Sequence, residues 1–308
     1  MAGLERAALS AGGPDVSSLA WGSWRAIEQF DGPADLARFL GAILDLGITT
    51  LDTADVYGGY AAEAFLGRAL AELGADAEQF EIITKCGIAA KSPARPEHKV
   101  KHYNSSAAHI RASAEASCRL LGRERIDVLL IHRPDILMDA KETADAFDAL
   151  IGAGTIGHAG VSNFAVPQFE LLHAALKNPL VTNQIEFSPL HLDPIEDGTL
   201  DQAQRLGFRP MLWSPFGGGS LFTGDAPEGT RIRAALEGVA ENYGLGLAGE
   251  GAGPAAIAWL MRHPTKPVPV VGTSNLDRLK GLVAAANVTL DRQDWYAIYE
   301  AILGRRVA

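Results

Sequence analysis

Four ionisable side chains stand at or just after the ends of apolar stretches. Asp52 ends one such stretch, and Tyr57 follows it by five residues. Lys85 and His132 each end a later stretch. Taken singly, Asp52 could be a helix cap, Lys85 a surface charge and His132 a core histidine. A charge that ends an apolar strand costs desolvation energy unless a partner compensates it. We therefore interpret the four residues as one group, with Lys85 and Asp52 as partners.

The group has the residue types needed for proton donation to a reacting oxygen. A lysine ammonium beside a tyrosine stabilises the phenolate and lowers a tyrosine pKa that is ordinarily about 10. Tyr57 would then act as a general acid, and Asp52 would keep Lys85 charged and in place. His132 would orient a carbonyl substrate or share in a proton relay. Reduction of a carbonyl requires such an acid together with a hydride.

The elements around these residues alternate between short β-branched runs and longer amphipathic stretches, a pattern typical of parallel β/α architecture. The expected strands are 19–24, 48–52, 80–85, 126–132, 156–162, 180–184, 209–214 and 267–272. The expected helices are 34–46, 61–73, 107–121, 141–153, 166–176, 199–206, 228–263 with a break, and 275–285. Eight β/α units in 308 residues favour a closed barrel over a doubly wound sheet.

The sequence thus predicts one domain, residues 1–308, folded as a single (β/α)8 TIM barrel. Its strand ends and the loops after them should bring the four residues to one mouth. Residues 291–304 have the apolar spacing of an extra C-terminal helix on the outside of the barrel. The first 18 residues contain the turn sequence GGPD and could form a hairpin or lid over the bottom of the barrel.

Composition excludes several classes of protein. The net charge of -10 and the pI of about 5.3 argue against a nucleic-acid binder, which needs a basic surface. Cys86 and Cys118 are the two cysteines, so we expect no disulfide framework. We also expect no signal peptide and no membrane span, and therefore a cytoplasmic protein with a small-molecule partner. The sequence leaves the oligomeric state open.

Two further patterns are interpreted as structural. His98, His102 and His191 with Asp193 lack the spacing of a ligand cluster, so we expect no metal site. The stretch 244–253 contains a G-x-G-x-x-G pattern, but it follows a helix where a dinucleotide-binding motif requires a strand. We therefore interpret that stretch as a flexible loop.

Six motifs in order resemble those of the aldo-keto reductase superfamily: LDTADVYGG, ITKCG, LLIHRPD, GVSNF, TNQIEFSPL and GTSNLDRL. The resemblance covers nearly the whole chain and is greatest to a bacterial subgroup of predicted oxidoreductases with GGY after the tyrosine. It implies NADP(H)-dependent reduction of an aldehyde or ketone to an alcohol. It also assigns the catalytic tetrad of that family to Asp52, Tyr57, Lys85 and His132.

The resemblance further implies a nicotinamide cofactor site at the barrel mouth. Ser162, Asn163 and Gln184 would bind the carboxamide, and Trp213 would stack on the ring. The pyrophosphate would lie against the loop that contains Ser214, Phe216, Gly217, Gly218 and Gly219, where glycines let backbone amides approach an anion. The segment that matches the adenosine 2'-phosphate site contains Gly272, Thr273, Ser274 and Arg278. An arginine suits a phosphate, which favours NADP(H) with NAD(H) as the alternative.

One departure from the family pattern concerns the adenine. Gly281 and Leu282 stand where related enzymes often carry an acidic residue and an asparagine, so the adenine would be held differently. On the substrate side, Trp24 would line the pocket together with Tyr57 and His132. The alternative function is a regulatory protein on the same barrel, similar to the channel-associated β subunits, which keep both the cofactor and the tetrad.

Overall fold

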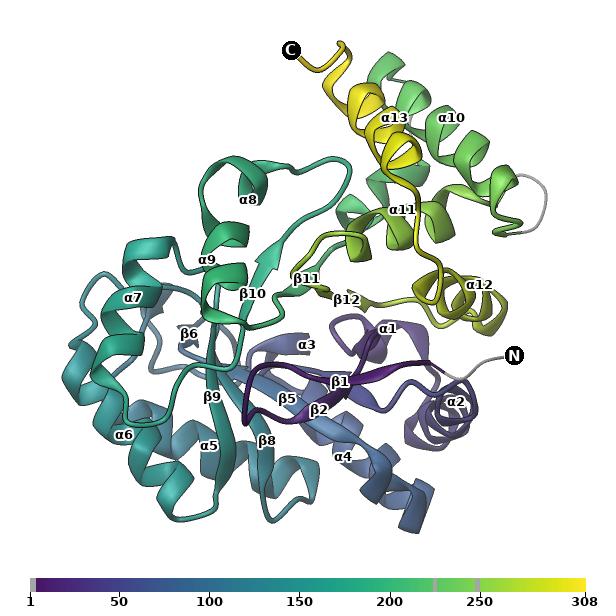
Figure 1. The fold of residues 1–308 in the computed structure, drawn as a ribbon. Helices are drawn as coiled ribbons and strands as arrows, with labels where there is room; N and C mark the ends of the chain where they lie inside the picture. The colour runs from purple at the N-terminus through teal and green to yellow at the C-terminus, as the bar shows by residue number, and fades with distance from the viewer. Residues whose placement is uncertain (1–3, 224–225, 247–249) are drawn as a thin grey trace.

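The computed structural model describes residues 4–223, 226–246 and 250–308, and its centre is a closed barrel of eight parallel strands (Figure 1). The strands follow the chain around the barrel, and β12 closes it by pairing with β3. They are β3 (Ala20–Gly22), β4 (Thr50–Asp52), β5 (Glu81–Cys86), β8 (Ile126–Ile131), β9 (Ile156–Ser162), β10 (Asn183–Glu186), β11 (Met211–Trp213) and β12 (Val268–Val271). The predicted TIM barrel is confirmed.

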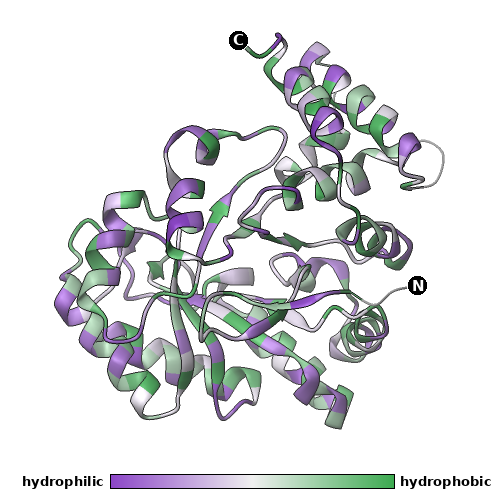
Figure 2. Cartoon of the chain, viewed as in Figure 1, coloured by the Kyte–Doolittle hydropathy of each residue, from purple (hydrophilic) through white to green (hydrophobic). Residues whose placement is uncertain are grey.

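Helices surround the barrel and alternate with its strands. They are α2 (Pro33–Asp45), α4 (Ala62–Leu73), α5 (Ala107–Leu121), α6 (Ala140–Gly152), α7 (Val166–Ala175), α9 (Thr199–Leu206), α10 (Pro227–Asn242), α11 (Ala252–Met261) and α12 (Leu276–Ala286). Several begin at a side chain that caps the first turn, such as Ser106, Asp139 and Asn275. Figure 2 shows hydrophobic and hydrophilic residues mixed along each helix, as expected for helices that cover a barrel.

The predicted break in the seventh helical region lies between α10 and α11. The glycine-rich stretch 244–253 falls there, and its residues 247–249 lie outside the described part of the chain. Gly244 and Gly246 follow a helix rather than a strand, and both have positive φ. The context that a dinucleotide-binding fingerprint requires is therefore missing at this point.

The barrel interior is packed with side chains rather than open. Its buried apolar cluster consists of Leu9, Val16, Ala20, Ile83, Val128, Leu130, Val181, Met211, Val268 and Val270. Leu9 and Val16 come from the hairpin of β1 (Arg6–Ala8) and β2 (Asp15–Ser17). The backbone N–H of Arg209, just before β11, donates to the carbonyl of Leu9 at 2.7 Å. The predicted N-terminal hairpin therefore closes the bottom of the barrel.

The mouth of the barrel carries short elements that periodicity did not predict. They are α1 (Ala26–Gln29), α3 (Tyr57–Tyr60), the hairpin of β6 (Ile88–Ala89) and β7 (His102–Tyr103), α8 (Asp193–Glu196) and the 3-10 turn η2 (Gly217–Phe222); a second 3-10 turn, η1 (Gly74–Gln79), follows α4. In α3 the turn passes through positive φ at Gly58, Gly59 and Tyr60. Glycine is suited to this backbone conformation because it has no Cβ.

The extra C-terminal helix is α13 (Arg292–Leu303), which lies beside α10 in a layer outside the barrel (Figure 1). Trp295 of α13 stacks on Trp259 of α11 with ring centroids 5.2 Å apart. Each of these indoles donates its N–H to the other residue's backbone carbonyl, at 3.2 and 3.0 Å. In the described part of the chain, no helix combines the length and the apolar character needed to cross a membrane.

Candidate active site

The structure brings the four predicted residues together at the mouth. Asp52 is the last residue of β4, Lys85 lies near the end of β5, and His132 directly follows β8. These strands are neighbours in parallel register, so their carboxyl ends open on the same face. Tyr57 begins the short helix α3 in the loop after β4.

The buried ion pair of Lys85 and Asp52 organises the group. The ammonium donates to both carboxylate oxygens, at 2.8 and 2.7 Å, to the carbonyl of Thr53 at 2.8 Å, and to the hydroxyl of Tyr57 at 3.3 Å. Gln184 Nε2 also donates to Asp52 Oδ1, at 2.7 Å. Burial lowers the pKa of Lys85, but the charge of Asp52 and the contact with Tyr57 outweigh it and raise that pKa. Lys85 is therefore an ammonium ion.

The pKa of Tyr57 differs from the sequence-based prediction. Burial raises the pKa of Tyr57 above its ordinary value of 10.0, because the phenolate would lose its hydration. The Lys85 ammonium lowers this pKa, as expected, but Asp52 raises it, and burial is the largest effect. The predicted net lowering of the Tyr57 pKa is therefore wrong. The phenol consequently keeps its proton at neutral pH, which suits a proton donor.

His132 is held as a neutral imidazole. Burial lowers its pKa well below 6.5, and the charges of Lys85, Arg133 and Lys101 lower it further. Its ring packs edge-on against Tyr57 with centroids 5.6 Å apart. Its Nδ1 is buried and has no hydrogen-bond partner among the described residues. A neutral ring can donate one N–H to a carbonyl oxygen, which fits the orienting role better than proton transfer.

The residues expected at the nicotinamide carboxamide form one hydrogen-bonded chain. Trp213 Nε1 donates to Asn163 Oδ1 at 2.9 Å, and Asn163 Nδ2 donates to Ser162 Oγ at 2.8 Å and to the His132 carbonyl at 3.3 Å. Ser162 Oγ donates in turn to the carbonyl of Gln184 at 2.9 Å. The side-chain amide of Gln184 contacts Asp52, so this residue connects the hydrogen-bonded chain to the ion pair of Lys85 and Asp52.

The segment expected at the pyrophosphate follows β11. Ser214 has positive φ, as do Gly217, Gly218 and Gly219, so the backbone curls tightly into η2. A Cβ added at Gly218 or Gly219 would meet no atom within 4 Å. Phe216 packs on Phe222 with ring centroids 5.2 Å apart, which anchors the turn. The glycine run therefore leaves an open stretch of backbone beside Trp213.

The segment expected at the 2'-phosphate follows β12. The Gly272 and Thr273 carbonyls accept hydrogen bonds from Gln29 and Trp21, at 2.9 and 3.2 Å. Ser274 leads into the amino end of α12, where Arg278 is exposed. The guanidinium of Arg278 has no ion-pair partner within the ranges that the structure describes. The ring of Trp213, the open glycine run and the cation of Arg278 at a helix amino end offer an aromatic face, backbone amides and a positive charge, which suit the ring and the phosphates of a nicotinamide cofactor.

Three other side chains complete the mouth. Trp24, the predicted pocket residue, follows β3; it is 58% exposed, and the Arg25 guanidinium lies 5.0 Å from its ring. Arg133 and Asp55 were missed, although both lie inside the motifs HRPD and DTADVY. Burial, aided by the charge of Glu63, raises the pKa of Asp55 from 3.8 to about 8. Its Oδ1 is buried without a hydrogen-bond partner in the described structure.

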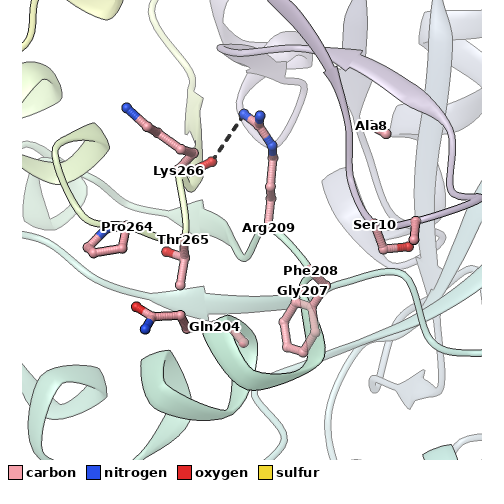
Figure 3. Close-up of a pocket in the computed structure, with 11 residues that line it drawn as sticks. Ala8, Ser10, Gln204, Gly207, Phe208, Arg209, Pro264, Thr265 and Lys266 are labelled. Atoms are coloured by element: carbon pink, nitrogen blue, oxygen red, sulfur yellow. Dashed lines mark hydrogen bonds between the residues drawn. The ribbon is translucent and has the colours of Figure 1, made fainter.

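Other candidate places in the molecule lie apart from this mouth. Among the described residues, no group of His, Cys, Asp and Glu is placed to hold a metal ion. A pocket of about 410 Å³ lies at the bottom of the barrel (Figure 3). There Arg209 directs its guanidinium to the Lys266 carbonyl, at 3.5 Å. None of the four predicted residues lines it.

Comparisons with known proteins agree with the fold and the motifs. The Aldo/keto reductase family profile matches residues 18–303. A 6-dehydroglucose reductase of Agrobacterium fabrum is 46% identical over 295 residues, which cover 96% of this chain and 97% of that protein. A 6-dehydroglucose reductase of Novosphingobium aromaticivorans is 40% identical over 298 residues, which cover 95% and 93%.

A solved structure supports the same assignment at the level of the fold. It is a thermostable aldo-keto reductase in complex with the inhibitor epalrestat, with a TM-score of 0.78 and 22% identity. The match covers 97% of this chain and 100% of that chain. This structure shows the fold, and the profile and the two relatives show the family: the chain belongs to the aldo/keto reductase family.

Proposed function

We propose that the protein reduces an aldehyde or ketone to an alcohol with NADP(H), with Tyr57 as the general acid. The observation that carries this proposal is the position of the Lys85 ammonium. It bonds both oxygens of Asp52 and lies 3.3 Å from the Tyr57 hydroxyl. A cation at this distance favours the phenolate that proton donation leaves behind.

The cofactor would be held by the residues that line the mouth after β9, β10, β11 and β12. Ser162, Asn163 and Gln184 would hold the carboxamide, and Trp213 would lie against the ring. The backbone of 214–218 would face the pyrophosphate, and Gly272, Thr273, Ser274 and Arg278 would surround the 2'-phosphate. When bound, the nicotinamide would supply the hydride. Arg278 supports NADP(H) over NAD(H), because a guanidinium binds a phosphate strongly.

The protein's own groups then place the carbonyl and move one proton. His132, as a neutral imidazole, would donate a hydrogen bond to the carbonyl oxygen and align it. Tyr57 would transfer its phenolic proton to that oxygen as negative charge develops on it. Lys85 would stabilise the resulting phenolate, while Asp52 keeps the lysine charged. In this scheme the carbonyl oxygen ends as a hydroxyl and the tyrosine is later reprotonated.

The two relatives suggest a substrate class. Both are named 6-dehydroglucose reductases, at 46% and 40% identity. We therefore take a sugar that carries a carbonyl group as the candidate substrate. The regulatory alternative is weaker, because these two relatives are named for a reduction. We also place this activity in the cytoplasm, since both thiols, Cys86 and Cys118, are free, as is usual in a reducing compartment.

The test compares the wild-type protein with Tyr57→Phe, and uses the exposed Tyr296→Phe on α13 as the matched control. NADPH oxidation is followed with 6-dehydroglucose and a panel of generic aldehydes, and NADPH binding is followed by fluorescence. We expect Tyr57→Phe to bind NADPH while losing about 10²- to 10⁴-fold in turnover. Wild-type protein that binds NADPH but reduces no carbonyl would instead support the regulatory alternative, and a lack of binding would refute the cofactor site.

A further inference from the structure

Arg133 is a cation at the mouth for which the described residues provide no acceptor. It directly follows His132 and is partly buried. Its Cζ lies 5.5 Å from the centre of the Trp213 ring. Across the described parts of the chain, its guanidinium has neither a carboxylate partner nor a hydrogen-bond acceptor. A guanidinium has five N–H donors, and leaving them unpaired in a partly buried place costs free energy.

Arg133 also lies close to the groups that act on the carbonyl. Its positive charge lowers the pKa of both Tyr57 and His132. Trp213, on which it lies, is linked through Asn163 to the carbonyl of His132. A carbonyl compound that contacts Tyr57 and His132 would therefore have its neighbouring atoms within reach of the guanidinium.

The loop beside this residue is basic although the chain has a net charge of -10. Between β6 and β7 it carries four cations without a carboxylate ion pair in the described structure: Lys91, Arg95, Lys99 and Lys101. The one acidic residue of this loop, Glu97, reaches His98 at 3.8 Å. The positive charge of Lys101, like that of Arg133, lowers the pKa of His132. This side of the mouth thus favours ligands that offer oxygen acceptors over apolar ones.

We propose that Arg133 determines substrate specificity by donating hydrogen bonds to oxygen atoms that the substrate carries close to its carbonyl group. Hydroxyl and carboxylate oxygens share this acceptor chemistry, and a carboxylate would also gain from Lys101. The inference rests on the proposed carbonyl reduction and adds to it the residue that recognises the substrate's other oxygen atoms. Such a site rejects an apolar analogue, because that analogue would leave the partly buried donors unpaired.

The experiment measures kcat/KM at saturating NADPH for three probes: D-glyceraldehyde with hydroxyls, succinic semialdehyde with a carboxylate, and butanal with neither. Arg133→Met is compared with Arg119→Met, in which the same change is made at an exposed arginine in the last turn of α5. We expect the preference of either oxygenated probe over butanal to fall about 10-fold or more in Arg133→Met. Arg119→Met should keep the wild-type ratios.

Arg133→Lys serves as the second variant, because it keeps the positive charge but loses the planar guanidinium and its paired N–H donors. It should recover part of the preference for succinic semialdehyde and less of that for D-glyceraldehyde. If the preference over butanal falls for only one oxygenated probe, the group on that probe, hydroxyl or carboxylate, is the one that Arg133 binds. Unchanged ratios in both variants, with wild-type turnover of the panel, would overturn the inference and leave the reductase function standing. Wild-type protein that reduces none of the probes would refute both the inference and the proposed reductase function.

Discussion

Lys85 and Asp52 show how a buried charge is kept in this protein. Their side chains are 1% and 5% exposed, yet both ends of the pair are hydrogen-bonded, including the amide of Gln184 on Asp52. Breaking such a pair leaves an uncompensated charge in a place without water. The pair, whose Lys85 contacts the proposed proton donor Tyr57, is thus a source of stability while both residues are present.

Asp52→Asn should therefore be both less stable and less active. Removing one partner of a buried ion pair costs about 3–5 kcal/mol, and the remaining ammonium would lose the charge that raises its pKa. Urea unfolding and the pH profile of NADPH-dependent turnover measure the two effects. Asp145→Asn, which removes an exposed partner of Lys141 on α6, is the control and should leave both unchanged. An Asp52→Asn protein of wild-type stability would contradict the argument.

Asp55 should make stability depend on pH in the opposite sense to most carboxylates. Its pKa is about 8 in the folded protein and 3.8 in the reference state, so the folded state holds the proton more tightly. Stability should fall as the pH rises from about 4 to about 8, because ionisation is disfavoured in the folded state. Asp55→Asn should remove this fall.

The measurement is the urea midpoint of wild type and Asp55→Asn near pH 5 and near pH 8.5. The variant should gain on the wild type as the pH rises, because the amide cannot ionise. Parallel pH profiles for the two proteins would show that Asp55 ionises normally, and would remove it as the source of the dependence.

At the scale of the element, the short helix α3 places Tyr57 through an unusual turn. Gly58 and Gly59 have φ of 56° and 65°, and Tyr60 follows with φ of 77°. The Tyr60 hydroxyl accepts from the backbone N–H of Ala90 at 2.8 Å, which ties the turn to the loop after β6. The position of the Tyr57 hydroxyl therefore depends on this backbone, and a change there should alter turnover.

Gly58→Ala tests that dependence. A residue with a Cβ at positive φ costs about 1–2 kcal/mol, and here the Cβ would also lie 2.5 Å from Ile27 Cδ1. Relief of the strain should move the Tyr57 hydroxyl away from Lys85 and lower turnover about 10-fold or more. Gly122→Ala places a Cβ in the same left-handed backbone conformation, with φ of 66° and ψ of 34° and nothing within 4 Å, and should lose stability while keeping turnover. Equal turnover in both variants would refute the proposed link.

At the scale of the whole molecule, the barrel and its outer helical layer share one apolar cluster. Ile298 and Ile302 of α13 belong to the same buried cluster as Leu40 of α2 and Ile82 of β5. The stacked pair of Trp259 and Trp295 ties α13 to the barrel helix α11. A continuous core of this kind is expected to unfold as a unit.

We therefore propose that residues 1–308 are a single domain and expect one cooperative transition in urea. Far-UV circular dichroism would follow the helices, and tryptophan fluorescence would report on all five tryptophans, of which Trp259 and Trp295 stack at the contact of α11 with α13. Coincident curves are expected, because α13 cannot leave without exposing its buried isoleucines. Two separated transitions would instead mean that the α10 and α13 layer is an independent unit.

The barrel and the location of the tetrad were predictable because both depend on local patterns. Runs of apolar residues with a period of two or of about 3.6 mark strands and helices whatever lies beyond them. Parallel strands in a barrel open their carboxyl ends on one face, so Asp52, Lys85 and His132 had to meet there. Ordered motifs over the whole chain indicated the family for the same reason.

The tertiary structure alone decided the electrostatics of the site. Whether burial or Lys85 dominates the pKa of Tyr57 depends on the number of atoms packed around the phenol, which no motif encodes. The contact of Gln184 with Asp52 joins residues 132 positions apart, and the orphaned oxygen of Asp55 results from loops that meet only in the fold. Spacing along the chain determines which side chains reach the mouth, whereas distances through space determine which of them are charged.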